Sequence, residues 1–434
     1  MSSLDVSSAG ANETSWLVSA KFSRSVSPSL PVVDLSRNVH CVLGLPIDLL
    51  DLPRALDRIR LAASEVSPFL LSTPNLNFLV NSRTYPAFRE SVQVSDLCLP
   101  DGMPIVWIAK LLGIPIKERV AGSDVFDELR SDISGRERLR VFLFGGQEGL
   151  AAAVAAKLNA EEGGLQSVGA ISPGFGSIEE MSSDEIIDTI SSSGAQFLVV
   201  SLGVKKGQAW LLHNHATLQV PVRVHLGAVI NFQMGIVKRA PLFMRKLGLE
   251  WLWRIKEEPY LWSRYAHDGL ALIGLLVTRV LPLALANQWQ RLRTWYRPST
   301  LGVTAMEEGD VFTIKLSGSA TIDNIARVQT CFENAVASGK AVVLDLSDLR
   351  FADSRFLGLL LMLRKQLLAN GVGFEFKGVK RPLARLLRWN GLEWLLAESA
   401  DPEKTAAIPK PSLKGSSHAQ SVNARARVAS KPRR

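Results

Sequence analysis

The stretch that most directly indicates the fold is Val141-Phe142-Leu143-Phe144-Gly145-Gly146, in which four large apolar residues run into a pair of glycines. An amphipathic, helix-like segment follows at residues 149–158. A strand that is apolar at every position is typical of a parallel sheet covered on both faces. Further short apolar runs at 69–72, 197–202 and 222–226 are separated by helix-like segments. We therefore predict an α/β fold built on a mainly parallel sheet.

Composition limits the class of protein. The chain has 434 residues, of which 47% are hydrophobic and 21% are charged, so it is long enough for two domains with real cores. Its three cysteines, Cys41, Cys98 and Cys331, are odd in number and widely spaced, which argues against a disulfide framework. The N-terminus lacks the uninterrupted apolar run of a secretory signal. We expect a cytoplasmic setting.

The positive charge is concentrated in two short blocks. The chain carries a formal charge of +9, and residues 236–300 and 402–434 each contribute an excess of seven positive charges. In the first block, the basic residues are interleaved with tryptophans and long apolar runs. This combination suits an anionic membrane surface better than a nucleic acid. We therefore expect a membrane surface as a partner and no nucleic acid.

Changes in composition divide the chain into five parts. Residues 1–41 are predicted to be a disordered leader, because they are Ser-rich and show no sustained period. The α/β domain described above spans residues 42–268, and an apolar and basic bridge spans 269–300. A second, smaller α/β domain is predicted at 301–400. Residues 401–434 form a predicted disordered basic tail.

The bridge contains an unusual apolar segment, residues 269–286 (GLALIGLLVTRVLPLALA), whose only charge is Arg279. On insertion scales a central arginine costs about 2.5 to 3.5 kcal/mol, which nearly cancels the gain from the aliphatic residues. Tryptophans and arginines flank the segment, as in an interfacial belt. We favour a helix that lies in the membrane interface. A helix buried against protein and a true membrane span are the alternatives.

Two loops in the first domain carry short polar residues directly after predicted strands. Thr73-Pro74-Asn75 follows the apolar run at 69–72, and Asp101 lies between a proline and a glycine in Leu99-Pro100-Asp101-Gly102. Such loops collect polar groups at the carboxyl edge of an α/β sheet. Both motifs also fit ordinary helix caps and turns, which need no ligand.

Two more local signals point to anion binding. Arg119, in the stretch 118–124 (ERVAGSD), carries a guanidinium that suits forked contacts with phosphate or carboxylate, or an ordinary surface salt bridge. Gly145 and Gly146 would let a phosphate approach backbone N–H groups, although any tight turn can use glycines in this way. Gly203, which follows the apolar run 197–202, repeats the arrangement.

The order of these motifs is more informative than any one of them. TPN, PDG, ERVAGSD, FLFGG, a strand that ends in glycine, KRAP (238–241) and GLEWLWR (248–254) follow one another in register. The chain thereby resembles the WecG/TagA/CpsF family of bacterial glycosyltransferases over residues 42–266. The resemblance implies a Rossmann-like domain that transfers an N-acetylmannosamine-type HexNAc sugar from a UDP-sugar donor to a polyprenyl-diphosphate-linked acceptor. It also implies inversion, no essential metal or cofactor, and peripheral association with the inner face of the cell membrane. The product would be an exopolysaccharide or another envelope glycan.

The resemblance assigns roles to individual residues. Asp101 matches the family's proposed general base, and one carboxylate within hydrogen-bond reach of the acceptor hydroxyl suffices for inversion. Thr73 and Asn75 match residues that line the same pocket, and Arg119 matches an arginine expected near donor or acceptor. Cationic groups must stabilise the departing UDP when no metal does so. The candidates are Arg239, Arg254 and Arg264. Further substrate-binding candidates are Gly145, Gly146, Gly203, Lys206 and Gln208.

The sequence departs from the family at one motif. Where the family typically has Gly-x-Pro-Lys-Gln-Glu, this chain has Gly203-Val204-Lys205-Lys206-Gly207-Gln208. Three explanations of this difference are open: the donor sugar differs, the lysines contact phosphate in compensation, or catalysis has been lost. The alternative function is therefore a non-catalytic UDP-sugar sensor or a scaffold that signals through the second domain.

Residues 303–400 resemble a STAS domain, with a predicted strand at 341–346 and a helix that begins near Ser354. In regulatory members of that family a serine at this position is phosphorylated, so Ser354 is a regulatory candidate. Large residues, Arg355 and Phe356, follow it, and we favour a simple helix N-cap for Ser354. The domain is expected to bind another protein, a lipid or the transferase domain itself.

Overall fold

The computed structural model describes residues 33–65, 67–296 and 300–398. Residues 1–32 of the predicted leader and the whole predicted tail, 401–434, lie outside the described residues.

The predicted start of the first domain at residue 42 is wrong. Helix α1 (Val33–Ser36) and strand β1 (Val39–Val42) precede or include that position. Leu35 and Val39 are fully buried, so this segment belongs to the core. Strand β1 pairs antiparallel with β2 (Leu45–Asp48) to form a separate two-stranded sheet, called here the N-terminal hairpin.

The first domain contains the predicted parallel sheet. Its six strands follow the order β4-β3-β8-β7-β5-β6, and every neighbouring pair is parallel. This confirms the α/β, Rossmann-like fold. The strands are β3 (Phe69–Ser72), β4 (Leu97–Cys98), β5 (Leu139–Gly145), β6 (Leu165–Ile171), β7 (Phe197–Ser201) and β8 (Val222–His225).

Strand β5 shows why an entirely apolar sequence was needed. Val141 and Leu143 pack in the core on one face of the sheet, whereas Phe142 and Phe144 pack in the core on the other. Alternate side chains of a strand point to opposite faces, so burial on both faces requires apolar residues at every position. One face is covered by α2 (Leu52–Ser64), α6 (Gly122–Ser131), α7 (Leu150–Ala160) and α10 (Val229–Gln233), and the other by α8 (Asp184–Ser192) and α9 (Val204–His213).

Two short helices, rather than one, connect β3 to β4. Helix α3 (Leu76–Thr84) ends before Tyr85, and α4 (Pro86–Gln93) begins after it. Tyr85 has φ −118° and ψ 108°, an extended conformation. A residue before proline avoids the helical region because the proline ring would clash with it, so Pro86 forces the break.

The second domain is a four-stranded sheet with helices. Strands β10 (Val311–Ala320), β11 (Ala341–Ala352) and β12 (Phe374–Lys377) are parallel, with β11 between the other two. Strand β9 (Leu301–Glu308) pairs antiparallel with β10 at the sheet edge and was not predicted. The helices are α15 (Ile325–Ser338), α16 (Ser354–Ala369), α17 (Arg381–Trp389) and α18 (Glu393–Glu398).

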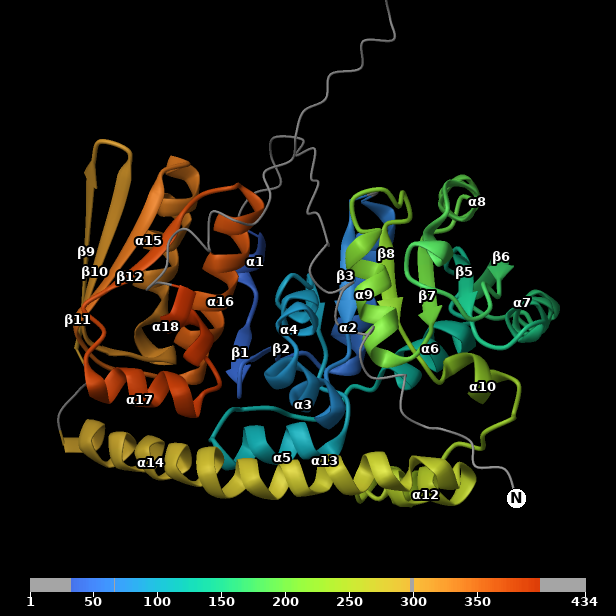
Figure 1. Ribbon diagram of the computed structural model, residues 1–434, viewed down its shortest axis with the longest axis horizontal. Helices are drawn as coiled ribbons and strands as arrows, with labels where there is room; N and C mark the ends of the chain where they lie inside the picture. The colour runs from blue at the N-terminus through green and yellow to red at the C-terminus, as the bar shows by residue number, and fades with distance from the viewer. Residues whose placement is uncertain (1–32, 66, 297–299, 399–434) are drawn as a thin grey trace, which may run out of the picture.

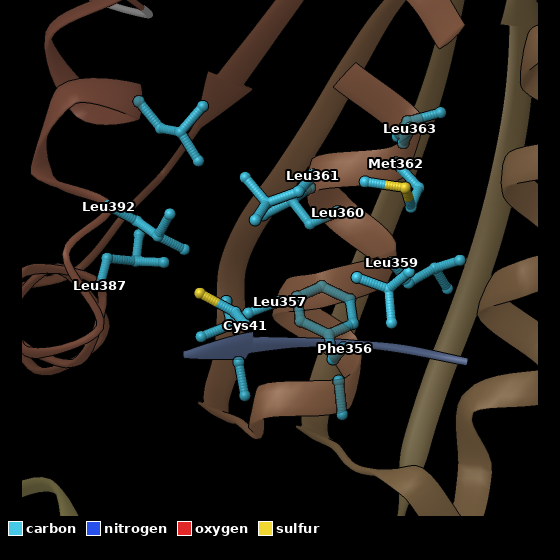
Figure 2. Packing of buried hydrophobic residues seen from close by; sticks show 14 of the residues in the cluster. Cys41, Phe356, Leu357, Leu359, Leu360, Leu361, Met362, Leu363, Leu387 and Leu392 are labelled. Atoms are coloured by element: carbon cyan, nitrogen blue, oxygen red, sulfur yellow. The ribbon is translucent and has the colours of Figure 1, made fainter. Parts of the chain in front are cut away.

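The N-terminal hairpin joins the two domains. In Figure 1, β1 lies beside α16 of the second domain, with α4 of the first domain on its other side. Figure 2 shows Cys41 of β1 near the leucines of α16, together with Leu387 of α17 and Leu392. One continuous hydrophobic cluster includes the hairpin, α16 and helix α5 (Met103–Leu111) of the first domain. The two domains therefore share a core.

A long helix runs beneath both domains (Figure 1). It comprises α13 (Trp262–Leu275), a π-helical turn (Leu276–Val280) and α14 (Leu281–Tyr296). Together with the 3₁₀ turn that precedes it (Pro259–Leu261), the stretch Pro259–Arg293 is the one helix of the described residues that is long and apolar enough to cross a membrane, judged by length and composition. The π-helical turn ends two residues before Pro282, which has no backbone N–H to continue the α-helical pattern.

Candidate active site

Loops at the carboxyl ends of β3 and β4 bring together the first two sequence motifs. The backbone N–H of Asp101 donates to Pro74 O at 2.9 Å, which ties the second loop to the first. A Cβ built on Gly102 would lie 3.5 Å from the Asn75 Cβ, and one built on Gly122 would lie 3.3 Å from Thr73 Oγ1. Thr73, Asn75 and Asp101 therefore lie together at the sheet edge.

Asn75 also has a structural role. Its side-chain oxygen accepts the backbone N–H of Phe78 at 3.2 Å, so it is the N-cap of α3. This is the simple explanation offered by the sequence, and it is confirmed. Because the capping side chain is fixed next to the Asp101 loop, the cap also shapes the edge of the site.

The carboxyl group of Asp101 has an unusual acidity. Burial raises the pKa of Asp101 to about 7, and the negative charges of Glu250 and Asp124 raise it further, while Arg119 and the N–H of Gly122 lower it. Among the described residues, no ion pair within 4 Å includes Asp101. A carboxyl whose pKa is close to neutral, without a fixed ionic partner, can accept a proton near physiological pH.

Arg119 lies at the centre of a charged cluster rather than at the surface. Its guanidinium pairs with Glu250 at 2.5 Å and with Asp124 at 3.0 Å. Asp124 also accepts Arg239 at 2.6 Å and Arg245 at 3.2 Å. We call Arg119, Asp124, Arg239, Arg245 and Glu250 the arginine cluster. It joins the loop before α6 to the segment that contains α11 (Leu242–Lys246) and α12 (Glu250–Glu257).

The three cations predicted for the leaving group are placed differently. Arg239 belongs to the arginine cluster, and its guanidinium lies 6.0 Å from the Phe232 ring centroid. Arg254 lies 5.0 Å from the same ring and pairs with Glu258 at 2.5 Å. Arg264 is exposed and lies over the ring of Tyr265. The structure thus groups Arg239 and Arg254 around Phe232, whereas Arg264 is not part of that group.

Several guanidinium donors in this region have no acceptor. Within the described part of the chain, Arg239 Nε, Arg245 Nε and Arg254 Nη1 are buried and have no hydrogen-bond partner. A buried donor without an acceptor is costly, so such atoms mark a place where a ligand can supply the acceptor. Arg245, Asp124 and Glu250 were not singled out from the sequence. Asp124 and Glu250 lie within the motifs 118–124 and 248–254 but had been given no role, and Arg245 was covered only by the basic excess of residues 236–300.

The glycine pair after β5 serves packing. A Cβ on Gly145 would lie 2.4 Å from Ser201 O, and Gly145 and Gly146 have φ values of +109° and +78°. The N–H of Gly146 donates to Ser201 O at 2.9 Å. This N–H thus has a partner within the protein, and the substrate-binding role of Gly145 and Gly146 stays a prediction. The close approach of β5 to the end of β7 explains the glycines.

The motif that differs from the family pattern, residues 203–208, has a structural explanation at Gly207. A Cβ on Gly207 would lie 2.1 Å from the ring of His225, so the histidine fills the space of a larger side chain. Burial lowers the pKa of His225, and its Nε2 lies 2.7 Å from Leu202 O, which fits a neutral ring that donates to this carbonyl. The role of His225 was not apparent from the sequence, because β8 and α9 meet only in the fold.

The other substrate-binding candidates in this motif have partners in the protein. Lys206 Nζ donates to Gly176 O at 2.7 Å. Gln208 is fully buried, and its amide donates to Ser72 Oγ at 3.3 Å. Among these candidates, Gly203, the N-cap residue of α9, faces open space, because a Cβ built there would meet no atom within 4 Å. Their predicted roles in binding stay predictions.

Ser354 is not the N-cap of α16, and that prediction is wrong. Asp353 is the cap, because its carboxylate accepts the N–H of Phe356 at 2.9 Å. Ser354 Oγ instead lies 3.0 Å from His40 Nδ1 in the N-terminal hairpin. Burial and Arg355 lower the pKa of His40 to about 4, so this imidazole is neutral near pH 7.

Metal-binding groups are sparse in this region. The described residues contain no group of three or more His, Cys, Asp and Glu side chains arranged to hold a metal ion. The three cysteines are free and buried.

Comparisons with known proteins agree with the motifs. Residues 40–284 match the glycosyl transferase WecG/TagA/CpsF family, and residues 303–397 match the Mlab, STAS domain family. A similar protein from Bacillus spizizenii is named N-acetylglucosaminyldiphosphoundecaprenol N-acetyl-beta-D-mannosaminyltransferase. It is 31% identical over 180 residues, which are 41% of this chain and 67% of the relative. A protein of the same name from Bacillus subtilis is 30% identical over 171 residues, which are 39% of this chain and 64% of that relative. The chain belongs to the WecG/TagA/CpsF family of glycosyltransferases and carries a STAS domain after the transferase domain.

Proposed function

We propose that the protein transfers a HexNAc-type sugar, similar to N-acetylmannosamine, from a UDP-sugar to a polyprenyl-diphosphate-linked acceptor in the synthesis of an exopolysaccharide or another envelope glycan. The observation that carries the proposal is Asp101, whose pKa is about 7, beside the arginine cluster. The names of the two Bacillus relatives, which specify a diphosphoundecaprenol acceptor and an N-acetylmannosaminyl group, support the choice of substrates.

The residues fit an inverting displacement. Asp101 removes the proton from the acceptor hydroxyl while the acceptor oxygen bonds to the anomeric carbon of the donor. The bond from that carbon to the diphosphate breaks, and UDP leaves with the electron pair. Arg119, Arg239 and Arg245 supply positive charge for the diphosphate, so the charge that develops there needs no essential metal. Phosphate oxygens would replace Asp124 and Glu250 as acceptors of the arginine donors.

The long helix supports association with a membrane. Seven apolar side chains of this helix are each between 56% and 73% exposed and recur at intervals of three or four residues, which places them on one face. We call this stripe the apolar face. It consists of Leu270, Ile273, Val277, Leu281, Leu285, Trp289 and Leu292.

The contacts of the long helix favour a position in the plane of the membrane. Near one end, Asn77 donates to Asp268 at 3.1 Å, and near the other, Gln290 donates to Ser319 at 3.2 Å. A spanning helix would carry one end about 30 Å to the far side of the bilayer, which these two contacts do not allow. Arg279 pairs with Glu393 at 2.7 Å and so does not face lipid unpaired. We propose peripheral association with the inner face of the cell membrane through the apolar face.

The test of catalysis is a UDP-release assay with several UDP-HexNAc donors and a short polyprenyl-diphosphate-GlcNAc acceptor. We expect turnover with inversion at the anomeric carbon, and loss of turnover but not of UDP binding in Asp101→Asn. The matched control is Asp57→Asn, because the Asp57 side chain is 70% exposed. UDP binding without turnover for any donor would refute catalysis and favour the sensor. A product with retained configuration would refute the displacement.

The test of membrane association is flotation with vesicles of phosphatidylcholine that contain or lack phosphatidylglycerol. We expect binding that increases with the anionic lipid and is lost in Leu281→Asp/Leu285→Asp. Leu61→Asp is the matched control, because Leu61 is an exposed leucine on α2, a helix of the sheet. Equal binding of the double variant and the wild type would show that the apolar face is not the membrane contact.

A further inference from the structure

The STAS domain was expected to bind a partner. Its helix α16 is covered by another part of the same chain. Twelve of its sixteen residues are buried. A Cβ on Gly358 would lie 2.2 Å from Val39 O, so the helix packs directly against the backbone of β1. Arg355 also donates to Val39 O at 3.2 Å. The N-terminal hairpin is therefore the partner of this helix in the structure.

A buried charge on α16 reaches the transferase domain. Lys365 Nζ lies 2.7 Å from Asp96 Oδ1 and 3.0 Å from an Asp34 oxygen, and it donates to Ser95 O at 3.3 Å. The side chain of Lys365 is only 6% exposed. Arg37 binds the same group, because it donates to Asp34 at 2.7 Å and to Ser95 O at 3.1 Å.

This network fixes the backbone that leads to Asp101. The other carboxylate oxygen of Asp96 accepts the N–H of Leu70 on β3 at 2.7 Å. Arg37 also forms a forked pair with Asp48, at 3.0 and 2.6 Å, and Asp48 accepts the N–H of Cys98 at 2.7 Å.

The remaining backbone donors of this segment are bound as well. Leu99 N–H donates to Ser72 O at 2.9 Å, and Asp101 N–H donates to Pro74 O at 2.9 Å. The segment from Asp96 to Asp101 is thus held against β3 at several successive points. From the STAS domain, Lys365 contacts Asp96 directly, and Gln366 donates to Asp34.

We propose that Lys365 is a positioning residue for Asp101, and that the STAS domain acts in this way as a built-in support of the transferase site. Two cations, Arg37 and Lys365, hold three carboxylates together in a buried site. Without Lys365, Asp96 and Asp34 repel each other, and the segment before Asp101 loses its ion pair with the STAS domain. The inference rests on the proposed function, because a positioning role requires a reaction at Asp101.

The test compares Lys365→Met with Glu90→Gln in the full chain. Glu90 pairs with Arg364 of the same helix α16 at 3.1 Å, and within the described residues no hydrogen bond or ion pair joins its side chain to the segment that leads to Asp101. Glu90→Gln therefore weakens the same domain contact without touching the network. For Lys365→Met we expect kcat to fall about tenfold or more while the KM for the UDP-sugar stays nearly constant, because misplacement of a catalytic group lowers the rate more than binding.

A second readout follows Asp101 itself. In protein labelled with ¹³Cγ-aspartate, the Asp101 signal is identified by its absence in Asp101→Asn, and its titration midpoint gives the pKa. The groups that face this carboxyl are Arg119, Glu250 and Asp124. We expect the midpoint to move by about half a unit or more in Lys365→Met and to stay in place in Glu90→Gln.

The outcomes are distinct. Equal kinetics and equal Asp101 titration in the two variants would overturn the positioning role. If Lys365→Met does not fold, Lys365→Gln, which keeps a hydrogen-bond donor but loses the charge, is held to the same criteria. A wild type without turnover on any donor would refute the proposed function. The Asp101 titration does not depend on turnover, so it still decides whether Lys365 controls this carboxyl.

Discussion

The carboxyl of Asp101 should destabilise the protein whenever it is ionised. Its pKa in the folded protein is about 7, compared with an ordinary value of 3.8, chiefly because of burial. The folded state therefore favours the protonated form, and stability is lost as the pH rises from 3.8 through 7. Asparagine resembles the protonated acid in shape and has no charge. We expect Asp101→Asn to be more stable than the wild type at pH 8 and, from the proposed role of Asp101, to be inactive.

The structure gives the size of the effect. A shift of about three pKa units corresponds to about 4 kcal/mol, at 1.36 kcal/mol per unit. Asp101 keeps partial contact with solvent, which reduces the effect, and we expect about 2 kcal/mol at pH 8. The advantage of the variant should grow between pH 4 and 7 and then stay constant. Well below pH 3.8, the Asp101 carboxyl is protonated in both the folded and the unfolded wild type, so the wild type and the variant should be equally stable.

The measurement is urea denaturation of wild type and Asp101→Asn at pH 4.5, 6, 7 and 8. Asp124→Asn is the control of opposite sign, because Asp124 binds three arginines and its loss should destabilise the protein. A free energy difference that does not change with pH, or a variant less stable than the wild type at pH 8, would refute the account of Asp101 as a strained base.

Three other substitutions test neighbouring features. Glu250→Gln removes a negative charge that raises the pKa of the proposed base, Asp101. The acid limb of the pH–rate profile should therefore move to lower pH, and the rate at pH 6 relative to the maximum should rise about severalfold. An acid limb that stays in place would contradict this. Gly207→Ala places a methyl carbon 2.1 Å from the His225 ring and should lower the free energy of unfolding by about 1–3 kcal/mol in urea. Combination with His225→Ala should cost less than the sum of the two single changes, and simple additivity would count against the clash. Arg279→Leu removes the ion pair with Glu393 of α18 and should lower the free energy of unfolding in urea by about 1 kcal/mol. Vesicle binding should be retained. Loss of vesicle binding would mean that this arginine contacts lipid.

The sheet and its edge could be predicted from the sequence. Strand β5 is buried on both faces, so its apolar pattern is local and visible. The loops that carry Thr73 and Asp101 follow neighbouring parallel strands, and such loops always emerge at the same edge. Four of the predicted residues, Thr73, Asn75, Asp101 and Arg119, do lie in one region of the structure.

Other features depend on partners that are distant in the chain. Strand β9 was missed because most of its residues are exposed and show no regular apolar pattern. Arg245 and Glu250 gain their meaning only from Asp124 and Arg119, more than a hundred residues earlier. Most of β1, the first strand of the N-terminal hairpin, fell within the predicted leader, because the surface that buries it, on α16, belongs to the other end of the chain.

The contact between β1 and α16 has a consequence for biosynthesis. His40 and Ser354 are separated by 314 positions, and a ribosome that adds about 5–20 residues each second needs roughly 15–60 s to cover that interval. During this time the nascent hairpin has no cover for its apolar side chains. The transferase half must therefore leave the ribosome unfinished, and cells depleted of chaperones that hold nascent chains should accumulate it as aggregates before translation ends.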